Sequence, residues 1–328
     1  LSGPRVIMKL CLVGYGSIAR AHMRALQGED VQHGWVVGRL PEPTTEFAQE
    51  FGFVQHTTDL TAALDDPTVD AVLITSPTDL HAHQTELALR AGKHVLCEIP
   101  LATRLGDVDR LIALADEQDR RLMVCHTQRY YDPLVLARER IAAGQVRPHH
   151  VVCRYMFLRR ENINWMGRRR SWTDNLLWHH GCHAVDTCLW LLGATEVSVS
   201  GHVALPGKHL GIPMDLAIVM RTPLDQLITI AMSYNTHIPQ HDYLIIGEDE
   251  TLLATPRSLV TRDAVLYEAP ETMPDAIAAQ DREFLAAVRE GREPAISGRA
   301  VRPTMAVLQA VQDQFNAWAP AGAVHPIP

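Results

Sequence analysis

A glycine-rich turn is the first group of residues in the sequence able to do chemistry. The motif Gly14-Tyr15-Gly16-Ser17-Ile18-Ala19 follows an apolar run directly and opens a helical pattern. Gly14 permits a tight turn, and Gly16 lets the backbone approach a diphosphate that also feels the positive helix N-terminus. We therefore expect a dinucleotide site formed by Gly14, Gly16, Ser17 and Ile18. The alternative is a tight strand-to-helix turn without a ligand.

The end of the second predicted strand indicates which dinucleotide would bind. Enzymes that use NAD usually carry an acidic residue there for the ribose 2'-hydroxyl, but this sequence has Gly38 and Arg39. Arg39 can pair with a 2'-phosphate in a bidentate fork, so NADP is favoured and NAD stays possible. The alternative for Arg39 is a solvated loop charge.

Small polar residues follow two later predicted strands. The fourth predicted strand ends at Thr75, Ser76 and Pro77, and His81 follows a few residues later. The fifth predicted strand ends at Glu98. Parallel strands bring these positions to the edge of the sheet where ligands bind, so we expect all five to contribute to the cofactor site.

Three histidines stand close together in Trp178-His179-His180-Gly181-Cys182-His183, which lies within a predicted helix over 176–192. Residues 179, 183 and 186 would share one helix face. An imidazole with a pKa near 6.5 can exchange protons at neutral pH. Zinc held by His179, His183 and Asp186 is an alternative, but the motif lacks the glutamate of a zincin, and we expect no metal.

The elements around these residues predict two domains. Up to about Gly144, short β-branched runs alternate with helical patterns, which indicates parallel βαβ units and a doubly wound Rossmann sheet. Longer strand-like runs then follow, with a helix near 176–192 and two terminal helices, so a mainly antiparallel open sheet is expected. We predict a dinucleotide-binding domain over 5–127 and an α+β substrate and oligomerisation domain over 128–328, whose last helix is free to pack back on the first.

Composition narrows the class of partner. The net charge of -8 argues against nucleic acid or anionic membrane as the main partner, and no apolar run is long enough to span a bilayer. The six cysteines show no disulfide or zinc spacing, so buried reduced thiols are expected. A cytoplasmic protein acting on a small molecule follows.

Several motifs together resemble the Gfo/Idh/MocA family of oxidoreductases. They are the glycine turn, Ser76-Pro77-Thr78 with His81, Ala91-Gly92-Lys93-His94-Val95, and His183-Ala184-Val185-Asp186. The resemblance covers essentially the whole chain. It implies NAD(P)-dependent oxidation or reduction at a carbinol carbon, usually of a sugar or polyol, in a homodimer or homotetramer.

Two positions depart from that family. It typically has a Glu-Lys-Pro lysine and an aspartate four residues before its catalytic histidine, where this sequence has Ile99 and His179. The resemblance makes His183 the base, while His179 orients or relays and His180 hydrogen-bonds substrate. The isoleucine removes the lysine-assisted deprotonation.

The segments Glu98-Ile99-Pro100-Leu101, His126-Thr127-Gln128-Arg129 and Trp178-His179-His180 resemble one branch of the family. That branch oxidises a carboxylated cyclic hemiacetal to a lactone with NADP, in the degradation of aromatic acids. An anionic substrate of this kind needs cationic forks, for which Arg129 and Arg170 are the first choices. Trp172 is placed to stack near the nicotinamide, or to pack in a core. Two other functions stay open: a sugar or polyol dehydrogenase, and a non-catalytic NADP-binding regulatory protein.

Overall fold

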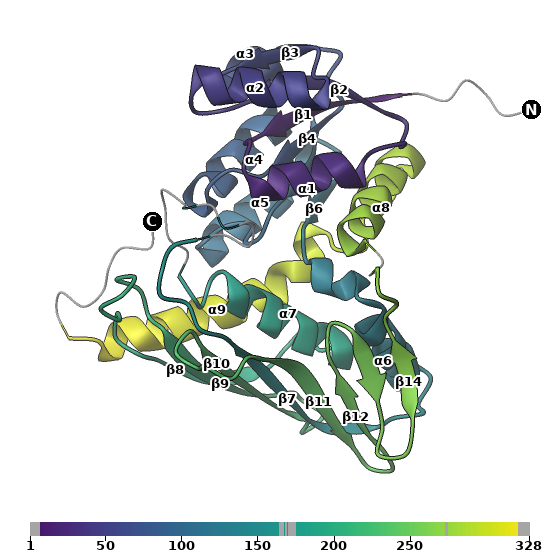
Figure 1. Ribbon diagram of the computed structural model, residues 1–328, viewed down its shortest axis with the longest axis vertical. Coiled ribbons are helices and arrows are strands. Elements are labelled where there is room, and N and C mark those ends of the chain that lie inside the picture. The colour runs from purple at the N-terminus through teal and green to yellow at the C-terminus, as the bar shows by residue number, and fades with distance from the viewer. Residues whose placement is uncertain (1–6, 164–166, 168, 170–174, 273–274, 321–328) are drawn as a thin grey trace, which may run out of the picture. The chain divides into compact units, whose positions relative to one another are not determined.

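The computed structural model describes residues 7–163, 167, 169, 175–272 and 275–320. It divides the chain into two compact units, each described by itself below (Figure 1). The first unit joins the residues up to Cys125 with Ile277–Arg302, and the second joins His126–Ala276 with the residues from Pro303 onward. The segment Ile277–Arg302, which the sequence placed in a 128–328 domain, therefore belongs to the first unit.

Six parallel strands form the sheet of the first unit, in the order β3-β2-β1-β4-β5-β6. The central strands are apolar runs buried on both sides, as parallel sheets covered by helices require. The order, with β1 and β4 adjacent at the centre, is that of a Rossmann sheet, so the predicted fold class is confirmed. The strands are β1 Met8–Val13, β2 Val31–Val37, β3 Gln55–Thr57, β4 Ala71–Ile74, β5 His94–Cys97 and β6 Leu122–Val124.

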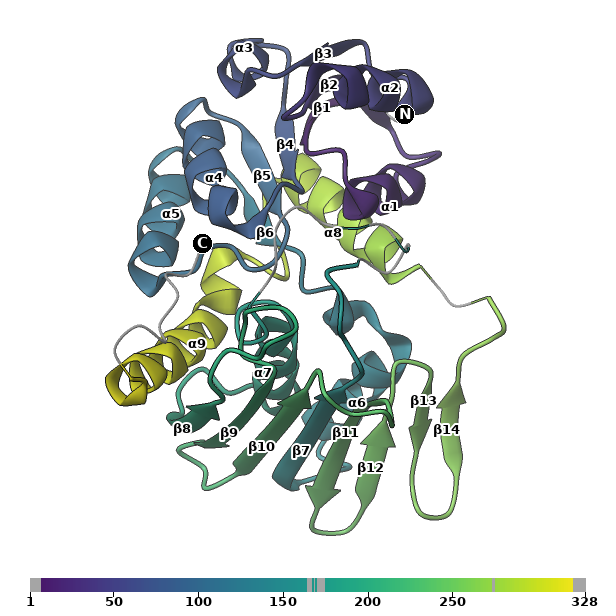
Figure 2. The same cartoon turned by 60° about the vertical axis from the view of Figure 1, so that its left-hand side comes forward.

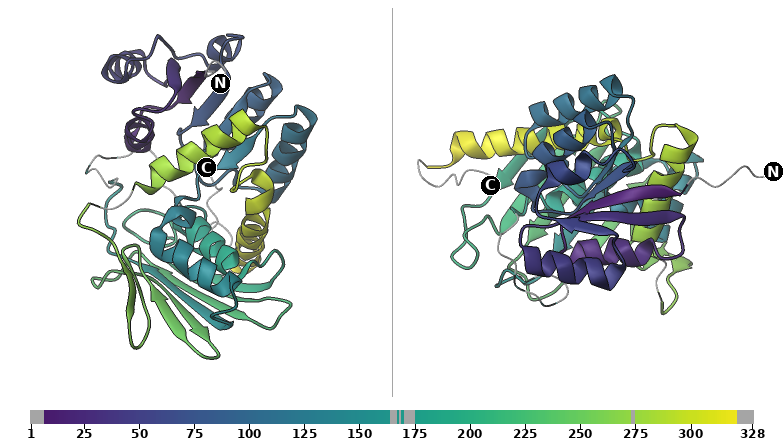
Figure 3. Two further views of the ribbon diagram at one scale, coloured as in Figure 1. Left: turned by 90° about the vertical axis from the view of Figure 1, so that its right-hand side faces the viewer. Right: turned by 90° about the horizontal axis from the view of Figure 1, so that it is seen from above.

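Helices connect these strands and cover both faces of the sheet (Figure 3). One pair, α4 and α5, packs together. These two helices begin at His81 and Leu105, and neither has a side-chain cap at its N-terminus. Thr78–Leu80 forms a separate 3-10 turn, η1. The helices are α1 Ser17–Ala25, α2 Pro41–Phe51, α3 Leu60–Leu64, α4 His81–Arg90, α5 Leu105–Glu117 and α8 Ala276–Glu290.

The return of Ile277–Arg302 to the first unit has a physical cause. The amide of Val124 donates to the carbonyl of Ile296 at 2.9 Å, and Met123 bridges to Ser297. Asp281 of α8 also binds His22 of α1 with 2.7 Å between carboxylate and ring nitrogen. Such contacts depend on residues more than 150 positions apart, which no local sequence pattern reveals.

An eight-stranded sheet organises the second unit, in the order β14-β13-β12-β11-β7-β10-β9-β8. All its neighbours pair antiparallel except β7 and β10, so the predicted mainly antiparallel sheet is confirmed. The short strands β12 to β14 had no sequence prediction. The strands are β7 Pro148–Met156, β8 Ser198–Val203, β9 Asp215–Arg221, β10 Leu227–Ser233, β11 Gln240–Gly247, β12 Thr251–Ala254, β13 Ser258–Val260 and β14 Val265–Glu268.

Helices lie on one face of this sheet, and among the described residues no helix covers the other (Figures 1 and 2). Helix α7 packs against β7 and β10, while α6 packs against β12, β13 and β14. The opposite face exposes alternate side chains, for example along β9. The helical segments are η2 Thr127–Tyr130, α6 Asp132–Ala142, α7 His180–Leu192 and α9 Gly298–Trp318, which enters the second unit at Pro303.

The start of α7 differs from the helix expected over 176–192. It begins at His180, and His179 is its N-cap residue. The preceding Trp178 is buried, and its indole Nε1 donates to Gln312 Oε1 of α9 at 3.1 Å. A buried indole N-H needs such a partner, so α9 fixes the turn that carries His179.

Candidate active site

The glycine turn of the first unit is packed against the end of β4. Gly14 has a φ of +110°, and a side chain there would place its Cβ 2.6 Å from Thr75 Oγ1 and 2.8 Å from Thr75 O. The Thr75 hydroxyl donates to the carbonyl of Val13 at 2.8 Å. Thr75 therefore packs directly against the turn, and its hydroxyl proton is already donated to the backbone.

The other side of the turn is open. A Cβ at Gly16 would meet nothing within 4 Å, and Gly16 is the N-cap residue of α1. No side chain caps this end of α1, and its first turn contains no acidic residue. Ser17 and Ile18 form that first turn and are half-buried. An open glycine beside helix amides that lack a side-chain cap suits the diphosphate of a dinucleotide.

Gly38 explains why no acidic residue ends β2. A Cβ there would lie 2.1 Å from Thr44 Oγ1 and 2.5 Å from the Tyr15 ring, so any side chain at this position would force Thr44 or Tyr15 to shift. Arg39 follows and is exposed. Within the described part of the chain, no hydrogen bond or ion pair engages its guanidinium, which leaves it available to a phosphate.

His81 joins the exits of β4 and β5. Its ring nitrogens contact the carbonyl oxygens of Pro100 at 2.8 Å and Ser76 at 2.9 Å. Burial opposes its charged form, but Cys97 and these two carbonyls outweigh burial and raise the pKa of His81 to about 9. Both nitrogens are thus occupied, so His81 shapes the site through the backbone rather than through a free imidazole. Pro77 lies between these elements, half-buried, directly before η1.

Glu98 is held by several donors at the carboxyl end of β5. Its Oε1 lies 3.0 Å from His22 Nε2, and its Oε2 accepts from the amide of Ile99 at 3.1 Å. The thiol of Cys125 also hydrogen-bonds this carboxylate. His22 in turn contacts Asp281 through its other ring nitrogen at 2.7 Å. The sequence predicted Glu98, but His22 and Asp281 were missed as its support.

Burial of His22 opposes its charged form, but contacts with Asp281 and then Glu98 outweigh burial and raise the pKa of His22 to about 10. At neutral pH the ring is therefore an imidazolium between two carboxylates. Atoms of His22, Glu98 and Cys125 also lie within 4.8 Å of one another, the spacing of a possible metal site. In the structure His22 and Glu98 hydrogen-bond each other directly, at 3.0 Å.

The histidines of the second unit form an aromatic cluster at the start of α7. The ring of His183 lies edge-on to those of His126 and His179, with centroids 5.9 and 6.5 Å apart. His180 stacks edge-on with His179 at 4.3 Å and hydrogen-bonds the hydroxyl of Tyr234 through Nδ1. The three predicted histidines are thus brought together, although His179 lies outside the helix. All three are half-buried.

Asp186 points into a buried ionic network. It accepts two hydrogen bonds from Arg129, at 2.7 and 2.8 Å, and a third from Thr304 at 3.1 Å, while His126 Nδ1 lies 3.3 Å away. Burial opposes ionisation, but Arg129 and then His126 outweigh it and lower the pKa of Asp186. The carboxylate needed for a zinc site with His179 and His183 is therefore already taken.

This network also changes the interpretation of Arg129. Two of its five N–H donors, one on Nε and one on Nη2, bind Asp186, so the guanidinium is largely committed to the protein. Arg170 and Trp172, the other predicted contacts from this region, lie outside the described residues.

Comparison with known proteins places the chain. Residues 8–126 match the oxidoreductase family with an NAD-binding Rossmann fold (GFO_IDH_MocA), and residues 134–265 match the C-terminal domain of bacterial oxidoreductases. The chain is 34% identical over 314 residues to 4-carboxy-2-hydroxymuconate-6-semialdehyde dehydrogenase from Sphingobium sp., covering 94% of this chain and 99% of the relative.

The chain belongs to the Gfo/Idh/MocA family. The inositol 2-dehydrogenase of Rhizobium meliloti is 25% identical to it over 91% of this chain and 94% of the relative. A levoglucosan dehydrogenase solved with NADH and L-sorbose has the same fold, with a TM-score of 0.84, 19% identity, and 94% of this chain and 97% of that chain covered. The protein is therefore an NAD(P)-dependent oxidoreductase that acts on a hydroxyl group of a small molecule.

Two further findings concern membrane-spanning helices and cysteines. None of the described helices is long and apolar enough to cross a membrane. All six cysteines are free and buried, as the sequence predicted. Burial and the nearby Asp186 raise the pKa of Cys182, which argues against a thiolate nucleophile beside the histidines.

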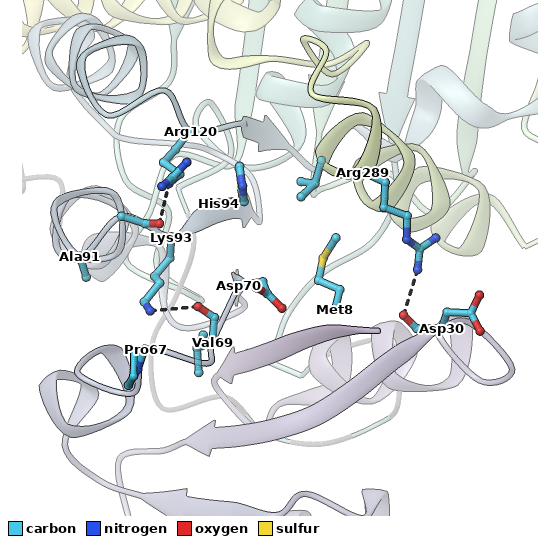
Figure 4. A pocket seen from close by; sticks show the side chains of 12 residues that line it. Met8, Asp30, Pro67, Val69, Asp70, Ala91, Lys93, His94, Arg120 and Arg289 are labelled. Atoms are coloured by element: carbon cyan, nitrogen blue, oxygen red, sulfur yellow. Dashed lines mark hydrogen bonds between the residues drawn. The ribbon is translucent and has the colours of Figure 1, made fainter. Parts of the chain in front are cut away.

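A pocket of about 930 Å³ lies elsewhere in the first unit, where β1, β4 and β5 begin (Figure 4). Its cationic side chains are engaged by backbone carbonyls: Lys93 by those of Asp66 and Val69, Arg120 by that of Gly92, and Arg289 by that of Asp30. These hydrogen bonds tie the three cationic side chains to the backbone. The glycine turn lies at the opposite ends of the strands. The pocket thus has no part in the cofactor site.

The charged state of His22 generates a prediction for stability. Because its pKa is about 10 in the folded protein and near 6.5 in the unfolded chain, its stabilising contribution is complete below pH 6.5 and is lost as the pH rises toward 10. We expect His22→Gln to be destabilised at pH 7, and we expect the gap between parent and variant to narrow toward pH 10. Urea unfolding of both proteins at a series of pH values measures this gap. A gap that stays constant with pH would show that His22 is neutral in the fold.

Proposed function

We propose that this protein is an NADP-dependent dehydrogenase that oxidises the cyclic hemiacetal of 4-carboxy-2-hydroxymuconate-6-semialdehyde to the lactone 2-pyrone-4,6-dicarboxylate. The observation that carries the proposal is the 34% identity to the Sphingobium dehydrogenase named for that semialdehyde, which extends over 94% of this chain and 99% of the relative. Relatives acting on inositols match at lower identity.

Bound NADP would accept the hydride that leaves the hemiacetal carbon. The hydroxyl proton then needs an acceptor in the protein, and we assign it to the imidazole of His183, with His179 orienting that ring and His180 donating to substrate. Ile99 is buried and offers no such group. A hemiacetal hydroxyl is more acidic than a sugar alcohol, so one imidazole suffices without a lysine.

The substrate carboxylates need cationic partners. We propose Arg170 for one of them and Arg129 for another. Arg159 joins them on structural grounds, because its guanidinium lies 5.1 Å from the centre of the Tyr234 ring, and Tyr234 hydrogen-bonds His180. A cation near the proposed substrate-binding histidine suits an anionic ligand.

The preference for NADP follows from the end of β2. Gly38 supplies no carboxylate that would repel a 2'-phosphate, and the exposed Arg39 supplies positive charge. We assign contacts with the diphosphate to Gly14, Gly16, Ser17 and Ile18. Contacts with the nicotinamide half are assigned to the residues that follow β4 and β5, namely Thr75, Ser76, Pro77 and Glu98.

We also propose that the sheet of the second unit forms a homodimer or homotetramer interface. Its helix-free face exposes Val219, whose side chain is 48% accessible. The residues paired with it on the neighbouring strands, Thr229 and Ser200, are polar. Apolar side chains on an uncovered sheet face favour burial against a second copy.

The substrate is tested with purified protein and NADP. We expect NADPH to form with the semialdehyde in its hemiacetal form, with the pyrone dicarboxylate as product, and with myo-inositol, glucose and levoglucosan turned over far more slowly. NADPH absorbance and chromatography of the product give the two readouts. Faster turnover of a polyol would establish the sugar dehydrogenase alternative, and NADP binding without any turnover would favour a regulatory protein.

The role of His183 is tested by His183→Asn, which keeps a polar side chain but cannot accept the proton. We expect kcat to fall by about 10²- to 10⁴-fold, the usual contribution of general base catalysis, with the Kd of NADP unchanged. His149→Asn is the matched control, because His149 is exposed on β7 and pairs with Glu248. Undiminished turnover by the His183 variant would remove the base from this mechanism.

The cofactor preference is tested by Arg39→Ala. Loss of a charged hydrogen-bond pair costs about 1.5–3 kcal/mol, so we expect the Kd of NADP to rise by roughly 10- to 100-fold while that of NAD stays nearly constant. Arg24→Ala is the control, since Arg24 is exposed on α1. Fluorescence titration measures both constants. An equal change for both dinucleotides would contradict a contact with the 2'-phosphate.

A further inference from the structure

Tyr15, the residue between the first two glycines of the glycine turn, lies against the end of β2. The amide of Gly14 donates to the carbonyl of Val37 at 2.8 Å, which holds the turn beside the last residue of that strand. A Cβ at the next residue, Gly38, would lie 2.5 Å from both Cδ1 and Cε1 of Tyr15. The ring of Tyr15 therefore occupies space that a side chain at position 38 would need.

Position 38 is the place where an NAD enzyme carries its acidic side chain. That side chain follows the second strand and hydrogen-bonds the 2'-hydroxyl of the adenosine ribose. Thr44 restricts the same space, because its Oγ1 would lie 2.1 Å from a Cβ at position 38. Thr44 is buried, and its hydroxyl is tied to the carbonyl of Leu40 at 2.6 Å. An acidic side chain at position 38 would therefore have to displace Thr44 and the ring of Tyr15.

The hydroxyl of Tyr15 lies close to the position that such a carboxylate would take. It is bonded to the ring carbon next to Cε1, so it stays within a few bond lengths of the Cβ position at residue 38. The described residues give this hydroxyl no hydrogen-bond partner, and it is not buried away from solvent. A phenol hydroxyl is uncharged and donates one hydrogen bond, so it can bind a phosphate that a carboxylate would repel.

We propose that Tyr15 is a second determinant of the dinucleotide preference, whose hydroxyl donates a hydrogen bond to the 2'-phosphate of NADP. This inference rests on the proposed NADP site, but not on the identity of the substrate. Arg39 directly follows Gly38 and is exposed, so it approaches the same phosphate as a cation. The end of β2 thus offers the phosphate one positive charge and one neutral donor. The ring of Tyr15 also keeps a carboxylate out of position 38.

The test is Tyr15→Phe, which removes the hydroxyl and keeps the ring against Gly38. Since a hydrogen bond to a charged group is worth about tenfold in affinity, we expect the Kd of NADP to rise by about tenfold, while that of NAD stays nearly constant. Calorimetry on the whole protein measures both constants. The pair 2',5'-ADP and 5'-AMP, which differ in the 2'-phosphate alone, should show the same change without the nicotinamide. The control is Tyr267→Phe on β14, whose hydroxyl donates to Asp132 at 2.7 Å and which should leave the ratio unchanged.

A double variant, Tyr15→Phe with Arg39→Ala, gives an independent measurement. If both side chains hold the 2'-phosphate, this variant should bind NADP no more tightly than NAD. A ratio of the two Kd values that Tyr15→Phe leaves unchanged, or equal weakening of both dinucleotides, would overturn the inference and leave the role of Arg39 intact. A parent protein that binds NAD as tightly as NADP would instead overturn the proposed cofactor preference, and this inference with it.

Discussion

A buried imidazolium between two carboxylates is the interaction on which the cofactor-binding unit depends. His22 ties α1, which starts at the glycine turn, to the end of β5 and to α8, which arrives from the other end of the chain. Buried charges are tolerated only when they are paired, so these three segments cannot separate without exposing an unpaired ion. The glycine turn at Gly16 and the end of β5 at Glu98 thereby become parts of one rigid framework.

The second unit uses the same physical device near its histidines. Asp186 is buried on α7 and is neutralised by Arg129, with Thr304 of α9 and His126 completing its surroundings. This pairing anchors the helix on which His183 lies, one turn before Asp186. Both units therefore contain an ion pair set in an apolar core, and both ion pairs join segments that are distant in the sequence.

Several predictions from sequence were correct because their cause is local. The glycine turn, the Rossmann strand order and the antiparallel second sheet each follow from residue types at short spacing. At other positions tertiary contacts decided the arrangement. Ile277–Arg302 joins the first unit through Ile296 and Asp281, and His81 and Arg129, predicted as ligand contacts, have most of their polar atoms bound within the protein.

The sequence by itself determined the class of this protein. It combines a glycine turn between a strand and a helix with the short continuous apolar runs of a parallel sheet, and few other folds have both. Only the tertiary structure decided which polar side chains remain available for a ligand. His22 and Asp281 are 259 positions apart, and the pairing of such buried charges depends on the packing of the whole unit rather than on any local pattern.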